Sequence, residues 1–324
     1  MNLSAIARKG LDGVLPSDAE ILFLIAQAPE RLNELLEHAH RIRMARFGNK
    51  VGLCAIVNAK SGTCSEDCAF CAQSGHHAAA SPQYPLLSER EIAAAAARAR
   101  RSGATRFGIV ASGKLVGGRD MDGFEAAVKA VAGQGMTPDL SPGLLDRSQL
   151  TRLKKAGLCG YHHNLETSAA YFPKMCTTHT YDEDVDAVRA GLDAGLYVCS
   201  GGISGIGETW DDRVELALLL RDLGVPSVPM NFLTPIPGTP LEGRAPLSPE
   251  EALTIIALYR FLLPDRQLRI CGGRPTVFGT ARRSEVFTAG ASGLMIGDYL
   301  TTRGGDAQTD LDDMRRAGLA PAKE

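Results

Sequence analysis

The chain has 324 residues, with 35 Lys and Arg against 37 Asp and Glu and a formal net charge of −2 at pH 7. This balance, without a dense basic run, excludes nucleic-acid binding driven by charge, and no apolar run is long enough to span a bilayer. Residues 1–13 lack the long apolar segment of a secretory signal. We therefore expect a cytoplasmic protein that binds neither nucleic acid nor membrane.

Residues 1–50 are expected to form an N-terminal helical extension. Ser17 and Glu20 have the spacing of a capping box, which predicts the start of a helix. A second helix is expected to follow, because apolar residues recur at helical spacing at Leu32, Leu35, Leu36 and Ala39. Both helices are expected to cover one end of a larger domain.

From residue 51 onward, short apolar runs alternate with helical patterns. We expect strands at residues 53–57, 106–111, 136–140, 158–164, 196–200, 228–233, 267–270 and 293–296. We expect helices at residues 89–101, 123–132, 148–156, 182–194, 211–223, 249–263 and 277–289. About eight strands that alternate with helices predict the α/β class and a (β/α)8 TIM-type barrel over residues 51–304, followed by a C-terminal tail at residues 305–324. A doubly wound open sheet shows the same alternation and stays open as the alternative.

Three cysteines follow the first expected strand in the spacing C-x3-C-x2-C: Cys64, Cys68 and Cys71. Three thiolates this close in one loop suit three irons of a cubane cluster and leave the fourth iron open, as a catalytic metal site requires. A structural zinc site is the alternative, with His76 or His77 as its fourth ligand. The remaining cysteines are scattered, and in a cytosolic chain their default role is that of small buried hydrophobes.

With Phe70 before Cys71, the motif reads C-x3-C-x-aromatic-C and resembles the fingerprint of the radical S-adenosylmethionine (SAM) superfamily. The resemblance implies a [4Fe–4S] cluster on the three cysteines, with SAM bound to the open iron through its amino and carboxylate groups. In that superfamily, one electron cleaves SAM to methionine and a 5′-deoxyadenosyl radical, which abstracts hydrogen from unactivated carbon.

Five further segments resemble the biotin synthase family. They are YHHNLETS at 161–168, VCSGGI at 198–203, GIGET at 205–209, MNFL at 230–233 and GDYLTT at 297–302. The resemblance implies a (β/α)8 barrel, a homodimer, a flavodoxin- or ferredoxin-type electron donor, and sulfur insertion between two carbons of dethiobiotin to form biotin. That reaction consumes two SAM and takes its sulfur from an auxiliary iron–sulfur cluster inside the barrel.

The same motifs supply candidates for SAM binding. Glu166, at the end of the fourth expected strand, is expected to accept hydrogen bonds from the ribose hydroxyls of SAM. Gly201 and Gly202 are expected to let the backbone approach the methionine end closely. Phe70 and Asn164 complete the expected cofactor-binding set.

Substrate-binding candidates come from the same strand ends. Asn164 and Asn231 offer paired donors and acceptors that suit the ureido ring of dethiobiotin, with strand-end capping as the alternative role. Because neighbours on a strand point to opposite sides, one of His162 and His163 is expected to face the site, and His162 is the candidate.

This chain departs from the family pattern at the auxiliary cluster. Familiar members hold a [2Fe–2S] cluster with three barrel cysteines and an arginine. The chain keeps one cysteine, Cys199, and the arginine, Arg269, but Gly108 and Asp139 stand at the other two positions. A cluster of the usual kind therefore lacks two of its usual ligands.

Other cysteines are placed to replace them. Cys271 lies two residues after Arg269 on one expected strand, so both side chains share a face. Our hypothesis is that Cys54, Cys199 and Cys271 hold a different auxiliary iron–sulfur cluster, and that Cys199, Cys271 and Arg269 take part in catalysis. The alternative is that these are core cysteines and the auxiliary cluster is lost. Substitute ligands, in order of preference, are Cys176 and Cys159.

Two other functions stay open. One is another radical SAM enzyme of the same barrel family, hydrogenase-maturase-like or methylornithine-synthase-like, which needs no sulfur donor. The other is a non-catalytic metal-binding or cluster-carrier protein, which predicts no SAM cleavage and leaves the glycine-rich segment 201–207 without a purpose.

Overall fold

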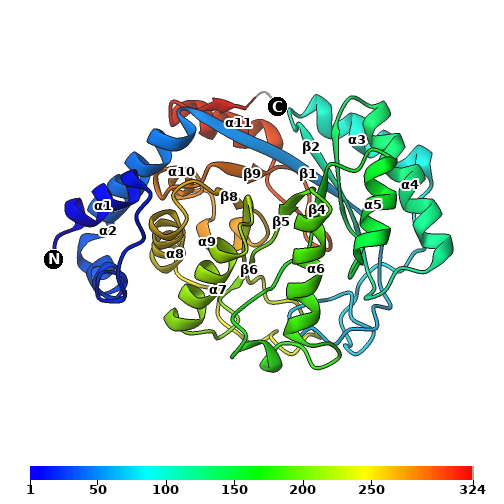
Figure 1. The fold of residues 1–324 in the computed structure, drawn as a ribbon, viewed down its shortest axis with the longest axis horizontal. Helices are drawn as coiled ribbons and strands as arrows, with labels where there is room; N and C mark the ends of the chain where they lie inside the picture. Colours follow the sequence, from blue (N-terminus) through cyan, green and yellow to red (C-terminus); the bar gives the residue numbers. More distant parts are fainter. Residues whose placement is uncertain (323–324) are drawn as a thin grey trace.

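The computed structural model describes residues 1–322, apart from the side chain of residue 119 (Figure 1). Helices surround a central set of strands, and the first two helices, α1 (Leu3–Asp12) and α2 (Asp18–Phe47), lie together at one side of it. Residues 323 and 324, the last two of the expected C-terminal tail, lie outside the described residues.

In the described part of the chain, eight parallel strands close into a barrel. They are β1 (Lys50–Lys60), β2 (Arg106–Ala111), β3 (Thr137–Ser141), β4 (Gly160–His162), β5 (Tyr197–Cys199), β7 (Ser227–Phe232), β8 (Gln267–Ile270) and β9 (Gly293–Met295). They pair in this order, and pairing of β9 with β1 closes the ring. The predicted (β/α)8 barrel is confirmed, and a doubly wound open sheet is excluded because both of its edges would be unpaired.

Helices connect the strands. They are α3 (Glu89–Arg101), α4 (Gly118–Gly133), α5 (Arg147–Lys155), α6 (Tyr181–Asp193), α7 (Trp210–Asp222) and α8 (Pro249–Leu262). Capping boxes begin α3, α5, α6 and α7, so side chains satisfy backbone N–H groups that have no partner inside the helix. The caps thereby define the residue at which each of these helices begins.

The helix expected at residues 277–289 is wrong in detail. The structure has two short helices instead, α9 (Arg274–Phe278) and α10 (Glu285–Thr288). Gly279 ends the first helix with φ at 54°, a left-handed conformation that a continuing helix cannot adopt.

The N-terminal extension packs on the barrel helices. The two expected helices are one element, α2, with a kink at Arg31, two residues after Pro29. The capping box of Ser17 and Glu20 is present at its start. The buried apolar side chains of α1 and α2 belong to the same hydrophobic core as the barrel, and α2 packs against α8.

The segment expected as a tail is folded as far as it is described. It contains α11 (Ala307–Arg316) and a short strand, β10 (Ala320–Pro321), which pairs with the start of β1. Arg274 on α9 donates two hydrogen bonds of 2.7 Å to the buried Asp310 on α11. The division at residues 50 and 304 stays a prediction.

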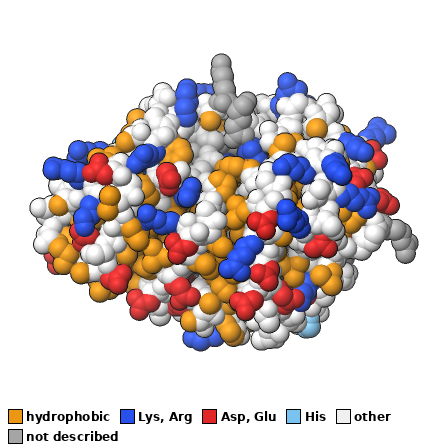
Figure 2. Space-filling model, viewed as in Figure 1, with side chains coloured by type: hydrophobic (Ala, Val, Ile, Leu, Met, Phe, Trp, Pro, Cys, Tyr) orange, Lys and Arg blue, Asp and Glu red, His pale blue; other side chains and the backbone are white. Residues whose placement is uncertain are grey.

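The surface carries both signs of charge. Figure 2 shows Lys and Arg side chains interspersed with Asp and Glu side chains over one face, in agreement with the net charge of −2. Among the residues described, no helix combines the length and hydrophobicity needed to cross a membrane.

Candidate active site

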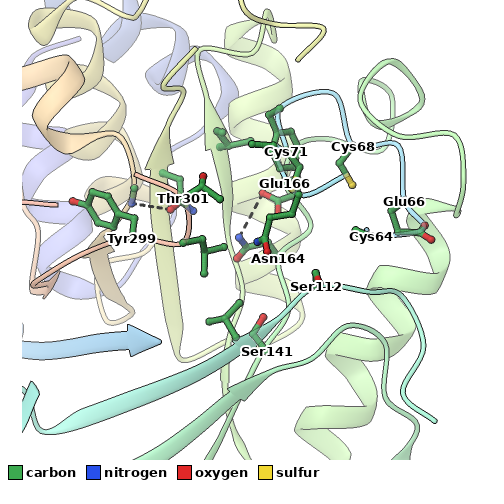
Figure 3. Close-up of a pocket in the computed structure, with 18 of the residues that line it drawn as sticks. Cys64, Glu66, Cys68, Cys71, Ser112, Ser141, Asn164, Glu166, Tyr299 and Thr301 are labelled. Carbon is green, nitrogen blue, oxygen red and sulfur yellow. Dashed lines mark hydrogen bonds between the residues drawn. The ribbon is translucent and has the colours of Figure 1, made fainter. Parts of the chain in front are cut away.

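A cavity of about 430 Å³ opens at the carboxyl ends of the barrel strands. Its wall includes Ser112 after β2, Ser141 on β3, and Tyr299 and Thr301 after β9. Figure 3 shows these groups around one space, with the cysteine loop opposite Tyr299 and Thr301. Active sites of (β/α)8 enzymes lie at this end of the barrel, and the volume suits a small-molecule site.

The clustered cysteines lie on the loop after β1. The Cys64 N–H donates to Gln73 O at 3.0 Å, and the Gly75 N–H donates to Cys64 O at 2.8 Å, so the loop closes on itself. Gly62 and Thr63 have φ of 80° and 47°, which turns the chain sharply just before Cys64. The cavity wall includes Cys64, Cys68, Phe70 and Cys71. Phe70 also packs on an apolar cluster of Ala69, Tyr171, Met175, Ile206 and Leu233.

These three thiols fit a metal cluster. Burial raises the pKa of Cys71. The pKa of Cys68 is also raised, mainly by the hydrogen bond with Cys176 and secondly by burial. Thiolates at these positions need a compensating positive charge, which bound iron supplies. The zinc alternative is disfavoured, because the Nε2 atoms of His76 and His77 lie 2.9 and 3.0 Å from backbone carbonyl oxygens. Neither Nε2 atom is therefore free to act as the fourth ligand of a zinc site.

Glu166 and Asn164 lie beside the cysteine loop (Figure 3). Asn164 Nδ2 lies 3.5 Å from Glu166 Oε2, and Asn164 Oδ1 accepts from the Gly201 N–H at 3.3 Å. Burial raises the pKa of Glu166 to about 8, against a smaller opposing effect of the Asn164 hydrogen bond. Glu166 also has φ of 63°, a strained conformation for a residue with a Cβ, and such strain often marks functional sites.

Gly201 and Gly202 have a packing role. A Cβ on Gly201 would lie 2.0 Å from Pro229 O, and a Cβ on Gly202 would lie 2.3 Å from Glu166 O. Both glycines therefore allow neighbouring backbones of the barrel to meet, including β6 (Gly202–Ser204), which pairs with β7. Their contact with SAM stays a prediction.

Asn231 lines the cavity, and its side-chain amide makes hydrogen bonds to the backbone. Its Nδ2 donates to Gly202 O at 3.2 Å, and its Oδ1 accepts from the Gly272 N–H at 2.9 Å. The strand-end capping considered as its alternative role is therefore present. Its contact with substrate stays a prediction.

His162, the last residue of β4, and His163, just after it, both line the cavity. His162 Nε2 lies 3.3 Å from Asp139 Oδ2, and His163 Nε2 lies 2.7 Å from Asp184 Oδ1. Strand alternation still extends to His163, because its ring stacks on the ring of Tyr161, two residues earlier, with the ring centres 6.0 Å apart, whereas His162 lies against Asp139. That His162 is the one to meet substrate stays a prediction.

A second group of thiols lies inside the barrel. Cys54 on β1, Cys199 at the end of β5 and Cys271 just after β8 are each about 2% exposed. Burial opposes the charged form of Arg269, but interactions with Cys54, Tyr197, Cys199 and Cys271 raise its pKa. Burial raises the pKa of Cys199 to about 12. Three buried sulfur donors around one guanidinium fit a cluster whose charge would offset the cost of thiolates, and Cys271 also lines the main cavity.

Asp139 takes a different role from a cluster ligand. It accepts from Arg106 Nε at 2.9 Å and from Arg106 Nη2 at 2.5 Å, deep inside the barrel. A Cβ on Gly108 would meet Ile56 Cγ2 at 3.0 Å and His162 Cε1 at 3.9 Å. The chain departs from the family pattern at Asp139 and Gly108. Arg106 lies beside the first of these residues and His162 beside the second.

The two substitute cysteines are not with this group. Cys176 is buried in the loop before α6, with its Sγ 3.9 Å from Cys68 Sγ. Cys159 is exposed at the amino end of β4, with its Sγ 3.5 Å from Gly157 O. Neither position supports a role in the interior cluster.

Sequence reasoning missed a polar network beside the cysteine loop. His179 Nδ1 lies 2.6 Å from Glu66 Oε2, and His179 Nε2 lies 3.3 Å from Asp184 Oδ2. Glu66, His179 and Asp184 all line the cavity. The one signal for them in the sequence is their place in loops or helix starts at the carboxyl ends of strands, where barrel enzymes carry their sites.

Two family models match the chain: the Radical SAM superfamily at residues 59–220, and the Biotin and Thiamin Synthesis associated domain at residues 229–320. With the barrel and its cysteine loop, these matches define a radical SAM enzyme. Biotin synthase of Syntrophotalea carbinolica is 47% identical over 305 residues, which are 94% of this chain and 93% of the relative. Biotin synthase of Trichlorobacter lovleyi is 47% identical over 99% of this chain and 97% of the relative. The chain belongs to the biotin synthase family.

Solved structures support the fold. Methylornithine synthase has a TM-score of 0.86 at 21% identity, covering 98% of this chain and 97% of its own. The FeFe-hydrogenase maturase HydG from Carboxydothermus hydrogenoformans has a TM-score of 0.80 at 18% identity, covering 99% of this chain and 79% of its own. At these identities the likeness concerns the barrel architecture alone.

Proposed function

We propose that this chain inserts sulfur between two carbons of dethiobiotin to form biotin. One observation supports the proposal beyond family membership: the half-buried thiols of the loop after β1 line the cavity, and a second set of thiols, buried inside the barrel, reaches the same cavity through Cys271. A radical SAM enzyme without sulfur transfer needs only the first set. The maturase-like and methylornithine-synthase-like alternatives are therefore not favoured.

Separate groups of residues are assigned to the cluster and to SAM. We assign Cys64, Cys68 and Cys71 to the [4Fe–4S] cluster, and Phe70, Asn164, Glu166, Gly201 and Gly202 to SAM. When bound, these groups supply a carbon-centred radical that abstracts hydrogen from the substrate. The cavity wall around Phe70 is apolar, so it would exclude water from a reactive species, while the Glu166 carboxyl would hold the ribose hydroxyls of SAM in place.

Substrate would lie between the two thiol sets. We assign Asn164, Asn231 and His162 to dethiobiotin, since all three line the cavity. His162 is held by Asp139, so its ring has a fixed orientation toward the substrate space. We assign Cys54, Cys199 and Cys271 to the auxiliary cluster, with Arg269 between them.

The experiment that tests this proposal is the iron and acid-labile sulfide content of the Cys64/Cys68/Cys71→Ala triple variant after anaerobic reconstitution. Several irons and sulfides per chain are expected to remain, because the interior thiols are intact. The wild type is expected to convert dethiobiotin to biotin in the presence of SAM and a reductant. Absence of iron from the triple variant, together with SAM cleavage but no biotin from the wild type, would point to the alternatives.

The wider setting follows the family. We infer a cytoplasmic homodimer with an electron donor of the flavodoxin or ferredoxin type, and a division into an extension (1–50), a barrel (51–304) and a C-terminal segment (305–324). Sedimentation of the reconstituted protein tests the dimer. SAM cleavage driven by a flavodoxin or by a ferredoxin tests the type of electron donor.

A further inference from the structure

Residues 297–304 form a closed loop after β9, which we call the β9 loop. Its two ends touch, because Gly304 packs so closely on Gly297 O that a Cβ on Gly304 would have no room. The Gly304 N–H also donates to Asp298 Oδ1 at 3.2 Å. Residues 299–302 all line the main cavity. A molecule that fills the cavity therefore contacts this loop.

One side chain of β1 connects the β9 loop to the cysteine loop. Asn58 lies near the carboxyl end of β1, and its Nδ2 donates to Leu300 O at 3.2 Å, across 242 positions of sequence. The same Nδ2 lies 3.3 Å from Gln73 Oε1 and 3.0 Å from Ser61 Oγ. A single amide group therefore contacts acceptors on both loops.

Gln73 is the residue through which Asn58 reaches the cysteine loop. It is 5% exposed, and its backbone O accepts from the Cys64 N–H at 3.0 Å. Its side-chain Oε1 also accepts from the Gly62 N–H at 3.3 Å. Gln73 thus closes the cysteine loop at the first of its three cysteines. A displacement of Asn58 would be transmitted to that point.

The donor side of the Asn58 amide is the side that the fold uses. Leu300 O and Gln73 Oε1 are both acceptors, so the amide nitrogen faces them, and its two hydrogens are shared among three acceptors. The Oδ1 of Asn58 is buried and has no hydrogen-bond partner within residues 1–322. Because an orphaned buried oxygen costs free energy, packing alone would favour an apolar residue here. The contacts of the nitrogen are therefore the contribution of this side chain.

We propose that Asn58 is a positioning residue that couples the β9 loop to the cysteine loop, so that a substrate in the cavity strengthens SAM binding. This coupling rests on the proposed function, with SAM at the cysteine loop and dethiobiotin against the β9 loop. A ligand that orders one loop also orders the other through Asn58, so the second ligand has less ordering left to do. Coupling is reciprocal, and SAM therefore strengthens dethiobiotin binding by the same factor.

The test measures the Kd of SAM with and without saturating dethiobiotin, in the anaerobically reconstituted full chain. Dethiobiotin is expected to strengthen SAM binding to wild type by about fivefold or more, the range usual for coupled sites. In Asn58→Ala and Asn58→Asp this factor is expected to fall to about one, while the Kd of SAM alone changes little. Asn58→Asp keeps the shape of the side chain but puts an acceptor oxygen where the donor nitrogen stood. A residue with a merely structural role would lower stability and leave the coupling factor unchanged.

Two further readouts accompany the binding measurement. The amount of 5′-deoxyadenosine formed per biotin is expected to rise in both variants, because SAM is then cleaved more often without substrate in place. In wild type, SAM alone is expected to slow amide hydrogen exchange in the β9 loop. Asn49→Ala is the matched control, because Asn49 is exposed just before the amino end of β1. It is expected to keep the wild-type coupling factor and product ratio.

Two results would overturn the role of Asn58. One is a wild-type coupling factor in a folded Asn58→Ala or Asn58→Asp variant. The other is unchanged hydrogen exchange in the β9 loop of wild type when SAM is added, a result that decides even if neither variant folds. Failure of the proposed function looks different: wild type would cleave SAM but form no biotin from dethiobiotin.

Discussion

Arg106 on β2 and Asp139 on β3 form a two-point ion pair inside the barrel, with distances of 2.9 Å from Nε to Oδ2 and 2.5 Å from Nη2 to Oδ1. Asp139 is 1% exposed, and the guanidinium of Arg106 also lies 4.3 Å from the centre of the Tyr197 ring. The ion pair also orients the His162 ring, because His162 Nε2 contacts the same Asp139 carboxylate.

Asp139→Asn is expected to lower the free energy of unfolding by about 3–5 kcal/mol, the usual cost of removing one partner from a buried ion pair. Denaturant unfolding of the cluster-free protein measures it. Asp122→Asn, which removes an exposed ion pair with Arg152, is the control and is expected to have little effect. Equal effects of the two substitutions would contradict the prediction.

The contribution of Asp139 is expected to depend on pH. Burial alone would raise its pKa, but the hydrogen bond and charge of His162 and the charge of Arg106 lower it below the usual value. A carboxyl with a depressed folded pKa stabilises the fold above its unfolded pKa of about 3.9 and loses that contribution as pH falls through the folded value. The stability difference between wild type and Asp139→Asn should therefore be complete at pH 7 and shrink below about pH 4. A difference that grows in acid would refute this.

Glu166 is expected to make SAM binding stronger as pH rises through about 8, because burial raises its pKa to about 8 and the ionised carboxylate is the better acceptor for ribose hydroxyls. Glu166→Gln should flatten this dependence and weaken SAM binding about tenfold to hundredfold, the loss of about 1.5–3 kcal/mol for a hydrogen bond to a charged group. Calorimetric titration of the reconstituted protein between pH 6.5 and 9 measures both. Glu183→Gln, at the start of α6, serves as control.

Cys271→Ala is expected to lose iron and sulfide of the auxiliary cluster while SAM cleavage continues, because the loop cysteines are untouched. Elemental analysis and SAM cleavage without substrate are the two measurements. Cys159→Ala, at an exposed cysteine, should keep the wild-type iron content. Full iron content in Cys271→Ala would remove Cys271 from the ligand set.

Gly201→Ala is expected to destabilise the fold by at least about 1–3 kcal/mol, because the new Cβ would lie 2.0 Å from Pro229 O. The matched control is Gly133→Ala in α4, where a Cβ meets nothing within 4 Å, and a gain of about 0.5–1 kcal/mol is expected. Thermal unfolding without SAM decides between packing and cofactor contact as the reason for this glycine: unchanged stability with weakened SAM binding would favour cofactor contact.

Local patterns in the sequence were sufficient to predict the barrel architecture. Each of the eight expected strands is present, and β2 and β8 match their expected bounds of residues 106–111 and 267–270. The capping box of Ser17 and Glu20 and the cavity-lining cysteine loop were also predicted correctly. These features succeed because hydrophobic period, helix caps and ligand spacing act over a few neighbouring residues. The helix expected at residues 277–289 failed where Gly279 breaks it.

The contacts between residues far apart in the sequence could not be predicted in this way. The contact of Cys176 with Cys68, the pairing of Arg106 with Asp139, and the presence of both His162 and His163 at the cavity all depend on how loops and strands far apart in sequence come together. Barrel closure sets these contacts through strand order and register, while loop conformation sets the rest. No local pattern in the chain encodes either quantity, because both arise from packing across the whole barrel.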